Sequence, residues 1–526
     1  MSAPTNGNAV DYFVDRHLRE ARGDVIAFRD PWRSLSYAGL AEATHRFARA
    51  LCEAGVSRER RVALLLLDTV DFPIAFWGAL RAGVVPVPIN TLLTPDMVGY
   101  ILTDSRADAV VVSAPLLAGL LPMLRGVVGL RRIVVAQPDG SVPAGVDDPR
   151  AVGLAAFLAG GAPDAETAAA SADEVAFWLY SSGSTGAPKG VRHVHGSLKA
   201  TSDTYGAQVL GIRVDDVMFS AAKAFHAYGL GNCMTFPMAV GAGAVFLPDR
   251  PTPDAVLDTL QKHQPTMFGG VPTLYAALLA SARIGAQAGS ARLRRCISAG
   301  EALPADIGRR WRDVVGVDIL DGIGSTEMLH IFISNRPDDV RYGTSGKPVP
   351  GYDAVVLDEQ GAPVADGEAG ELVVRGPSAA DGYWNQRART RRTFRGEWTH
   401  TGDTYSRDAE GYYRFYGRTD EMLKVSGIWV SPFEVEEALI SHPTVLEAAV
   451  VGHADPDGLI KPKAFVVLQG TARGQDTAAV SELLKAHVKA QIGVWKYPRW
   501  IVFVEALPKT ATGKIQRFRL REGDAA

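Results

Sequence analysis

The sequence predicts an α/β protein with a large amino-terminal domain, a β-rich subdomain and a small α+β carboxy-terminal domain. Strand-like and helix-like segments alternate through the first half, which is typical of helices packed on parallel sheets. Between residues 352 and 416, short β-type runs are separated by Gly, Asp and Pro turns instead. A compact α+β pattern follows the Gly417-Arg-Thr-Asp420 segment. At 526 residues the chain is also too long for one ordinary core.

The alternation is clearest near the amino terminus. Continuous apolar runs bounded by turn residues indicate buried strands, and longer segments between them indicate helices. The expected order is strand 61–66, helix 72–82, strand 84–89, helix 94–105 and strand 109–112. Residues 159–174 are rich in Ala and Gly and are expected to be an exposed connection. This region therefore predicts a large domain with a mostly parallel sheet.

One stretch, residues 224–249, contains a long run without charged side chains. Its glycines and Pro237 would interrupt a membrane helix, so we expect a buried helix followed by a strand at 244–247. A further helix is predicted at 253–263, because Thr252 can cap it and Pro253 suits its first turn.

The last part of the chain predicts a separate unit. Strands are expected at 354–357 and 371–375 in the β-rich subdomain, which would close an amino-terminal domain of residues 1–418. In the remaining domain, 419–526, Ser431, Pro432 and Glu434 form a capping-box pattern for a helix that ends near His442. Strands at 448–451, 464–468 and 500–504 and a helix at 477–489 complete it.

Composition excludes several classes. The chain is 47% hydrophobic with a formal net charge of −3. It has no basic excess that would indicate nucleic-acid binding and no acidic tail that would indicate a disordered partner. Cys52, Cys233 and Cys296 are too widely spaced for a disulfide framework or a metal cluster, so buried free thiols are expected. The amino terminus lacks a signal-peptide core. We expect a cytoplasmic protein without a membrane partner, as a monomer or homodimer.

The strongest local motif is Ser181-Ser-Gly-Ser-Thr-Gly-Ala-Pro-Lys-Gly190, directly after the strand-like segment 175–180. Small residues let backbone amides approach phosphate oxygens, hydroxyl groups add donors, and Lys189 adds a positive charge. The spacing differs from that of a P-loop, which has Gly-Lys-Ser/Thr after four variable residues. A flexible linker is the alternative, and the preceding strand and the Pro-Lys pair argue against it.

This run resembles the phosphate loop of the adenylate-forming superfamily, which includes acyl-CoA synthetases, luciferases and peptide-synthetase adenylation domains. Further motifs resemble that superfamily in the same order along nearly the whole chain. They are Gly322-Ile-Gly-Ser-Thr-Glu327, Thr401-Gly-Asp403, Tyr416-Gly-Arg-Thr-Asp420 and Pro508-Lys-Thr-Ala-Thr-Gly-Lys514. The resemblance implies that a carboxylic acid attacks the α-phosphate of ATP, forms an acyl-AMP and is then transferred to coenzyme A.

By this resemblance, Lys514 bridges the carboxylate and the α-phosphate, Lys189 stabilises phosphate charge, and Thr185 and Glu327 hold Mg²⁺. Asp403 and Arg418 contact the ribose. Ile323 stands where many relatives have an aromatic residue, so apolar packing would replace stacking on adenine. The expected ATP- and AMP-binding residues are Ser181, Ser182, Gly183, Ser184, Thr185, Gly186, Lys189, Gly300, Glu301, Ala302, Asp321, Gly322, Ile323, Gly324, Ser325, Thr326, Asp403, Phe415, Arg418 and Lys514.

The second half-reaction implies a rotation of the small domain. Asp420 matches the hinge position of the superfamily, and such motion needs only a few residues at a boundary. Lys424, Ser426 and Gly427 match the segment that faces the pantetheine tunnel, where a glycine allows close backbone approach.

The segments 222–232, 321–332 and 343–351 most resemble the benzoate–CoA ligase branch. His226 departs from the Phe expected there; it is either a gate residue or a polar edge that accepts an amino or hydroxyl substituent. The residues expected to line the acid pocket are His226, Ala227, Tyr228, Gly229, Val271, Pro272, Gly300, Ile323, Gly324, His330 and Ile331. Small and apolar side chains would suit a flat ring, although several of these residues could equally be core.

The expected function is therefore an aryl-acid–CoA ligase for benzoate, 2-aminobenzoate or a hydroxybenzoate, with ATP, Mg²⁺ and coenzyme A. An adenylation enzyme that loads a separate carrier protein is the main alternative. Only 12 residues follow Lys514, so no fused carrier is expected. An inactive nucleotide-binding regulator would be expected to lose Lys514, Glu327 or Asp403, and all three are present. A luciferase-type oxidation is not favoured by a pocket of aryl size.

Overall fold

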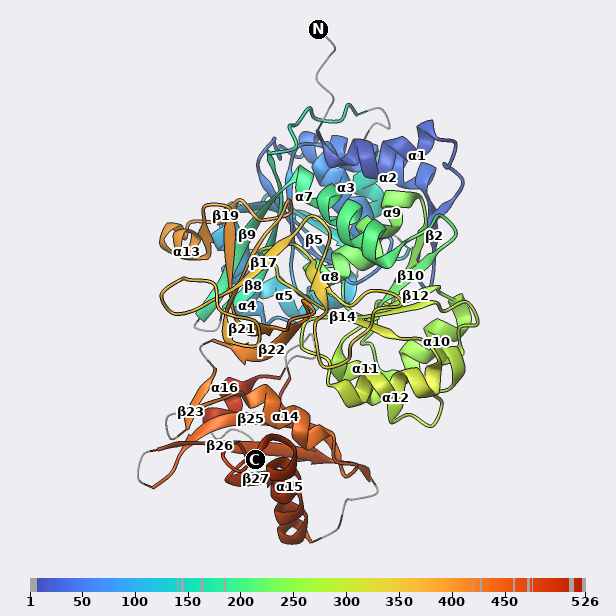
Figure 1. The fold of residues 1–526 in the computed structure, drawn as a ribbon. Helices are drawn as coiled ribbons and strands as arrows, with labels where there is room; N and C mark the ends of the chain where they lie inside the picture. Colours follow the sequence, from blue (N-terminus) through green and yellow to red (C-terminus); the bar gives the residue numbers. More distant parts are fainter. Residues whose placement is uncertain are drawn as a thin grey trace.

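The computed structural model describes residues 7–139, 141–142, 146–161, 165–183, 186–419, 421–425, 428–456, 459–470, 474, 476–509 and 515–522. Figure 1 shows a large body that holds the amino-terminal and middle segments, with the carboxy-terminal segments from β23 on (dark orange to dark red) packed beneath it. The predicted α/β class and the division into a large and a small unit agree with this arrangement.

A nine-stranded sheet forms the centre of the large body. Its order is β16-β15-β14-β13-β12-β10-β11-β1-β2, and the strands from β14 to β1 run parallel. Its strands are β1 (Ile26–Arg29), β2 (Ser34–Ser36), β10 (Val217–Ser220), β11 (Gly243–Val245), β12 (Met267–Gly270), β13 (Arg295–Ser298), β14 (Ile319–Gly324), β15 (Ile331–Ser334) and β16 (Lys347–Pro348).

A second, five-stranded parallel sheet has the order β4-β3-β5-β6-β7. Its strands are β3 (Arg61–Leu65), β4 (Val85–Pro88), β5 (Ala107–Ser113), β6 (Arg132–Ala136) and β7 (Ala151–Gly153). The predicted alternation of strands and helices is confirmed here within one or two residues at most ends. Strands β3, β4 and β5 are wholly buried, which explains why they appear in the sequence as continuous apolar runs.

Helices cover both sheets. Thr252 caps α10 by accepting a hydrogen bond from the Ala255 amide, as predicted from the sequence. The helices of the large body are α1 (Arg16–Arg19), α2 (Tyr37–Glu53), α3 (Asp71–Arg81), α4 (Pro95–Ser105), α5 (Ala114–Gly126), α6 (Leu154–Gly160), α7 (His195–Thr201), α8 (Ala227–Leu230), α9 (Phe236–Val240), α10 (Pro253–His263), α11 (Pro272–Leu279), α12 (Ala305–Val315) and α13 (Arg387–Thr393).

The uncharged stretch forms buried helix and then strand, but in a more broken form than predicted. Between α8 and α9 lies a π-helical turn, Gly231–Thr235, and the strand β11 ends at Val245 rather than at residue 247. In the part of the chain that the structure describes, no helix is long and apolar enough to cross a membrane. One expectation is wrong: Cys52 is exposed, because it lies on the solvent side of α2, whereas Cys233 and Cys296 are buried.

Two further sheets belong to the large body. The hairpin of β8 (Val175–Gly183) and β9 (Gly186–Val194) is joined by β19 (Gly382–Tyr383) in a three-stranded antiparallel sheet. The β-rich subdomain is antiparallel, as its turn-separated runs predict. Its strands are β17 (Asp353–Leu357), β18 (Ala369–Arg375), β20 (Phe394–Arg395), β21 (Trp398–Arg407) and β22 (Tyr413–Arg418).

The carboxy-terminal unit has its own cores, formed by residues between 423 and 520. Ser431 caps α14 by accepting from the Glu434 amide, as predicted, but the Glu434 carboxylate binds Lys496 at 2.6 Å rather than closing a capping box. The elements are β23 (Leu423–Val425), β24 (Ile428–Val430), α14 (Pro432–Ile440), β25 (Val445–Ala454), β26 (Ile460–Leu468), α15 (Thr477–Ile492), β27 (Trp500–Phe503) and α16 (Arg517–Glu522).

Candidate active site

The segments predicted to line the acid pocket and to contact adenine follow strands of the nine-stranded sheet. Strands β10, β12, β13 and β14 are neighbours and parallel, so their carboxyl ends meet at one edge of this sheet. Gly270, Ser298 and Asp321 lie side by side in this register. Ligands in open α/β sheets bind beyond the carboxyl ends of the strands. The predicted pocket and nucleotide segments, which follow these strands in sequence, are therefore brought to one place.

The predicted phosphate loop is the tip of the β8–β9 hairpin. Ser181 pairs with Lys189 across this hairpin. The Ser181 hydroxyl is buried, and none of the described residues forms a hydrogen bond with it. Ser184 and Thr185 lie outside the described residues, and only the backbone of Ser182, Gly183 and Gly186 is described. A buried hydroxyl without a protein partner, next to a lysine, is suited to bind a phosphate oxygen.

The hairpin contacts Glu327, the predicted metal ligand. Lys189 Nζ donates to Glu327 Oε1 at 2.8 Å, and the Tyr383 hydroxyl donates to the same oxygen at 2.7 Å. Burial alone would raise the pKa of the Glu327 carboxyl, but the Lys189 charge and both hydrogen bonds lower this pKa below its ordinary value. Glu327 is therefore an anion at neutral pH. Sequence reasoning missed Tyr383, which belongs to none of the recognised motifs.

A second contact joins the hairpin to the segment before Glu327. His193 Nε2 lies 2.8 Å from the Thr326 carbonyl oxygen, so this nitrogen carries the proton. Burial lowers the pKa of His193 to about 4, and the ring is neutral at physiological pH. His193 was also missed from the sequence, because a lone histidine in a strand has no distinguishing pattern. It fixes the predicted Ser325-Thr326-Glu327 segment against β9.

The predicted ribose ligands lie together. Arg418 Nη1 donates to Asp403 Oδ1 at 2.9 Å and to the Thr401 carbonyl, which orients the carboxylate between neighbouring strands β21 and β22. Phe415 packs against the rings of Tyr405 and Phe433 at centroid distances of 5.3 and 5.4 Å. Phe433 belongs to α14, so this predicted nucleotide residue also contacts the carboxy-terminal unit.

The predicted adenine segments follow β13 and β14. Gly300 has a φ of +96°, a backbone conformation that favours glycine, and it lies exposed after β13. Asp321 is buried; its carbonyl accepts from the Asn335 amide and side chain, and burial raises the pKa of its carboxyl to about 8. Ile323 is half-buried at the end of β14. Other predicted nucleotide residues near the ends of β13 and β14 are also half-buried: Glu301, Ala302, Gly324, Ser325 and Thr326.

Aromatic side chains surround His330 in the predicted acid pocket. Its ring lies 5.1 Å from Tyr205, 5.6 Å from Tyr228 and 4.6 Å from Phe236, measured between centroids. Its Nε2 lies 3.2 Å from the Tyr228 carbonyl oxygen, and burial lowers the pKa of His330 to about 3. The His330 ring is therefore uncharged at neutral pH. The half-buried His226 packs on Phe225 at 4.5 Å.

Other predicted pocket residues have structural contacts of their own. The Tyr228 hydroxyl lies 2.9 Å from the Ile297 carbonyl oxygen and 3.1 Å from that of Gly270, so it is directed at the sheet. Gly229 has no room for a side chain, since a Cβ would lie 2.0 Å from the Lys223 carbonyl oxygen. Ala227 and Val271 are half-buried, whereas Pro272 and Ile331 are buried. Some of these positions therefore shape the backbone around the pocket.

The carboxy-terminal unit also contacts the segment that follows β13. The Ile515 amide donates to Glu301 Oε1 at 3.1 Å. Ile515 follows Lys514, which lies outside the described residues, as do Asp420, Ser426 and Gly427. Lys424 lies in β23, with only its backbone described.

The described residues contain no group of three or more His, Cys, Asp or Glu side chains that could hold a metal ion. Mg²⁺ itself is commonly held by one or two carboxylates together with substrate phosphates. Both side-chain hydrogen bonds to Glu327 end on Oε1, so neither of these donors occupies Oε2.

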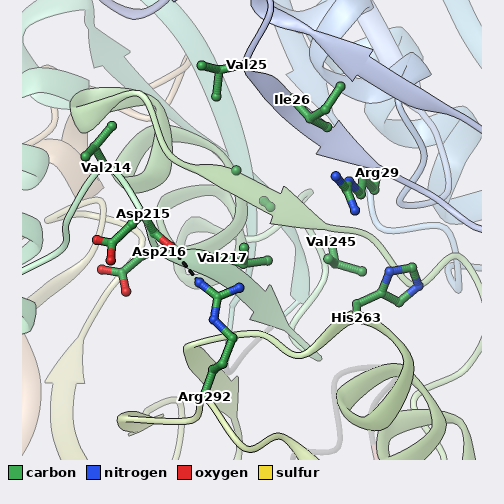
Figure 2. A pocket seen from close by; sticks show the side chains of 12 residues that line it. Val25, Ile26, Arg29, Val214, Asp215, Asp216, Val217, Val245, His263 and Arg292 are labelled. Carbon is green, nitrogen blue, oxygen red and sulfur yellow. Dashed lines mark hydrogen bonds between the residues drawn. The ribbon is translucent and has the colours of Figure 1, made fainter.

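A cavity of about 300 Å³ lies at the opposite edge of the sheet (Figure 2). Val217 and Gly243, at the amino ends of β10 and β11, form part of its wall. Arg292 donates to the Asp215 main-chain carbonyl at 2.9 Å, and Asp216 binds Arg294, which lies outside the lining. None of the predicted site residues lines this cavity, so it is separate from the predicted chemistry.

The chain is thus a two-unit α/β protein whose predicted adenine segments follow neighbouring parallel strands. The chain belongs to the AMP-binding enzyme family: that family's model matches residues 14–384, and the model of the AMP-binding enzyme C-terminal domain matches residues 434–514. The resemblance to the adenylate-forming superfamily is confirmed.

Individual relatives match over almost their full length. The chain is 54% identical to a 4-hydroxybenzoate–CoA/benzoate–CoA ligase of Rhodopseudomonas palustris, covering 98% of this chain and 94% of that protein. It resembles the structure of a benzoate–CoA ligase from Burkholderia xenovorans (49% identity, TM-score 0.90, coverage 98% and 99%). It also resembles an anthranilate–CoA ligase in complex with anthranoyl-AMP (40% identity, TM-score 0.92, coverage 99% and 98%). The predicted benzoate–CoA ligase branch is thereby confirmed.

Proposed function

We propose that this chain is an ATP-dependent aryl-acid–CoA ligase, which converts benzoate or a hydroxybenzoate into its CoA thioester through an aryl-AMP. The observation that carries the proposal is that Lys189, which pairs with Ser181 across the hairpin, binds Glu327, three residues before the aromatic cluster around His330. The names of the relatives, which are benzoate–, 4-hydroxybenzoate– and anthranilate–CoA ligases, support the same substrate class.

In the first half-reaction, the acid's carboxylate attacks the α-phosphate and pyrophosphate leaves. We assign Lys189 and the Ser181 hydroxyl to phosphate oxygens and Asp403 to the ribose hydroxyls, because fixed donors and acceptors lower the barrier most where charge develops. Glu327 and Thr185 would hold Mg²⁺, which supplies charge neutralisation on the phosphates when bound. Lys514 is the proposed cation at the reacting carboxylate.

In the second half-reaction, the CoA thiolate attacks the acyl carbonyl and AMP leaves. The proposed hinge is Asp420, and Lys424, Ser426 and Gly427 are the proposed contacts of the pantetheine arm. A rotation at this boundary would remove Ile515 from Glu301 and present the other face of the small unit.

The acid itself would lie against neutral, apolar groups. His330 is uncharged, and the Tyr228 hydroxyl is directed at backbone carbonyls, so neither offers a charge to a ring substituent. A flat unsubstituted ring needs no polar partner, whereas an amino or hydroxyl group needs one or loses its hydration. We therefore expect benzoate to be the preferred acid, with hydroxybenzoates next and 2-aminobenzoate after them.

A substrate panel tests the proposal. Pyrophosphate release and CoA-thioester formation are measured with benzoate, 3- and 4-hydroxybenzoate, 2-aminobenzoate, phenylacetate and hexanoate. Benzoate should give a kcat/KM at least about tenfold above that of hexanoate, since a lost aromatic contact costs about 1–3 kcal/mol. Pyrophosphate release without any thioester would favour a carrier-protein acceptor. Absence of thioester with every aryl acid would refute the proposed substrate class.

A further inference from the structure

Three side chains hydrogen-bond to one another beside the phosphate hairpin, and Thr393 Oγ1 lies 3.3 Å from the Tyr383 hydroxyl. Tyr383 donates to Glu327 Oε1 at 2.7 Å, Lys189 donates to the same oxygen at 2.8 Å, and Lys189 Nζ lies 3.0 Å from the Tyr383 hydroxyl. Tyr383 is only 4% exposed, and the side chains of Lys189 and Glu327 are 16% and 15% exposed. The cluster is thus largely shielded from water, where charge-assisted hydrogen bonds are strong.

Main-chain hydrogen bonds hold the segment that carries Tyr383 next to Glu327. Tyr383 pairs with Val191 in β9, two residues beyond Lys189. The Ala380 amide donates to the Glu327 carbonyl at 2.8 Å. The segment that carries the tyrosine is therefore attached both to the phosphate hairpin and to the main chain of the predicted metal ligand.

The orientation of the ring is fixed independently of Glu327. Gly382 has a φ of +135°, and a Cβ there would lie 2.8 Å from Thr390 Cγ2. The Tyr383 amide donates to Thr390 Oγ1 at 3.0 Å, and its ring packs on Phe394 with a centroid distance of 5.5 Å. Glycine before the tyrosine thus lets α13 approach closely, and α13 and β20 together hold the ring.

The Tyr383 hydroxyl is a permanent donor. A phenol keeps its proton at neutral pH, and the Tyr383 hydroxyl donates this proton to Glu327 Oε1. Lys189 differs, because its ammonium is also the proposed donor to phosphate oxygens. An ammonium on a flexible stem that moves to a phosphate would leave the Glu327 carboxylate with one side-chain donor among the described residues, which is Tyr383.

We propose that Tyr383 is a positioning residue: its hydroxyl holds Glu327 Oε1 in place, so that Oε2 stays available to the nucleotide-bound Mg²⁺ when Lys189 turns to the phosphates. This inference rests on the proposed function, in which Glu327 is a ligand of that ion. Tyr383 itself touches neither substrate nor metal in this scheme. It acts by preventing the carboxylate from rotating, as groups behind a metal ligand commonly do.

The test compares nucleotide affinity with and without metal. Titration calorimetry measures the Kd of a non-hydrolysable ATP analogue in excess Mg²⁺ and again in EDTA. Y383F keeps the ring and its packing but loses the hydroxyl. We expect a roughly tenfold weaker Kd in Mg²⁺, the size of one hydrogen bond to a charged group, and a change of less than about twofold in EDTA.

A matched control and a double mutant isolate the effect. Tyr37 is fully buried and donates one hydrogen bond to the Ala242 carbonyl, so Y37F loses a comparable bond far from the hairpin. Its Kd should be unchanged under both conditions, while its Tm falls by as much as that of Y383F. In an E327Q background, Y383F should weaken binding in Mg²⁺ by no further factor, because both changes remove one function.

Equal losses in Mg²⁺ and EDTA would show a merely structural role for Tyr383 and overturn the inference, as would an unchanged Kd in Mg²⁺ or additive effects with E327Q. These results are distinguishable from failure of the proposed function. If wild-type protein forms no aryl-CoA yet shows the Mg²⁺-dependent pattern, the substrate class is wrong and the role of Tyr383 stands.

Discussion

The Ile515 amide donates to the Glu301 carboxylate across the boundary between the large and the small unit. Glu301 lies in the segment after β13 that was expected to contact adenine, and Ile515 follows the proposed catalytic Lys514 directly. This contact therefore joins the nucleotide side of the large unit to the lysine segment. In the proposed mechanism the first half-reaction needs Lys514 at the site, whereas the second does not.

Glu301→Ala should therefore slow adenylate formation and spare thioester formation from supplied aryl-AMP. Loss of one hydrogen bond to a carboxylate predicts about a tenfold lower rate of pyrophosphate release. Glu301→Gln, which keeps an acceptor oxygen, should recover most of that rate. Glu434→Gln removes an ion pair to Lys496 within the small unit and serves as the control. If both half-reactions slow equally in Glu301→Ala, the contact only stabilises the fold.

Lys514→Ala should reduce adenylate formation by about 10² or more, because it removes a cation from the point where charge develops. Its rate of thioester formation from supplied aryl-AMP should stay near that of the wild type. Asp420→Pro should give the reverse pattern, since it stiffens the proposed hinge. Both variants are assayed by pyrophosphate release and by CoA-thioester formation, measured separately. Parallel losses in the two assays for either variant would contradict the assigned role.

Local signals in the sequence predicted much of the fold. Strands β3 to β5 are apolar runs that need no distant information, and Thr252 and Ser431 cap helices through residues three positions away. The motifs also predicted that Lys189 and Glu327 share a site. Contacts between distant segments were not predictable. Lys496 lies 62 positions from Glu434 and binds its carboxylate, which therefore does not form the predicted capping box. The bond from Tyr383 to Glu327 likewise depends on the pairing of β19 with β9.

Gly229 was expected to be small because an aromatic ring needs the space, and the structure gives a different reason. A methyl group there would meet the Lys223 and Ala222 carbonyl oxygens at 2.0 and 2.5 Å. Gly229→Ala should therefore destabilise the protein by about 1–3 kcal/mol, the usual cost of overpacking. The ratio of kcat/KM for benzoate to that for hexanoate should change less than threefold. A stable variant with altered acid preference would show that Gly229 faces the substrate.

Buried histidines predict loss of stability in mild acid. His17 is buried; its Nε2 lies 2.7 Å from the Met238 carbonyl oxygen, and its Nδ1 accepts from Arg22. Burial lowers the pKa of His17 from 6.5 to about 4. Between these two pH values the ring binds a proton in the unfolded chain but not in the folded chain. Stability is therefore complete above pH 6.5 and falls as the pH drops toward 4. At pH 5.5 the loss is about 1 kcal/mol for this ring.

His17→Gln keeps a donor for the Met238 carbonyl and an acceptor for Arg22 but does not titrate. The difference in unfolding free energy between pH 7.5 and pH 5.5, measured by urea denaturation, should shrink by about 1 kcal/mol in this variant. Part of the pH dependence should remain, because burial also lowers the pKa of His193 and His195 to about 4. The exposed His453 provides the control, and His453→Gln should leave the difference unchanged. An unaltered difference in His17→Gln would mean that this ring is protonated in the folded protein.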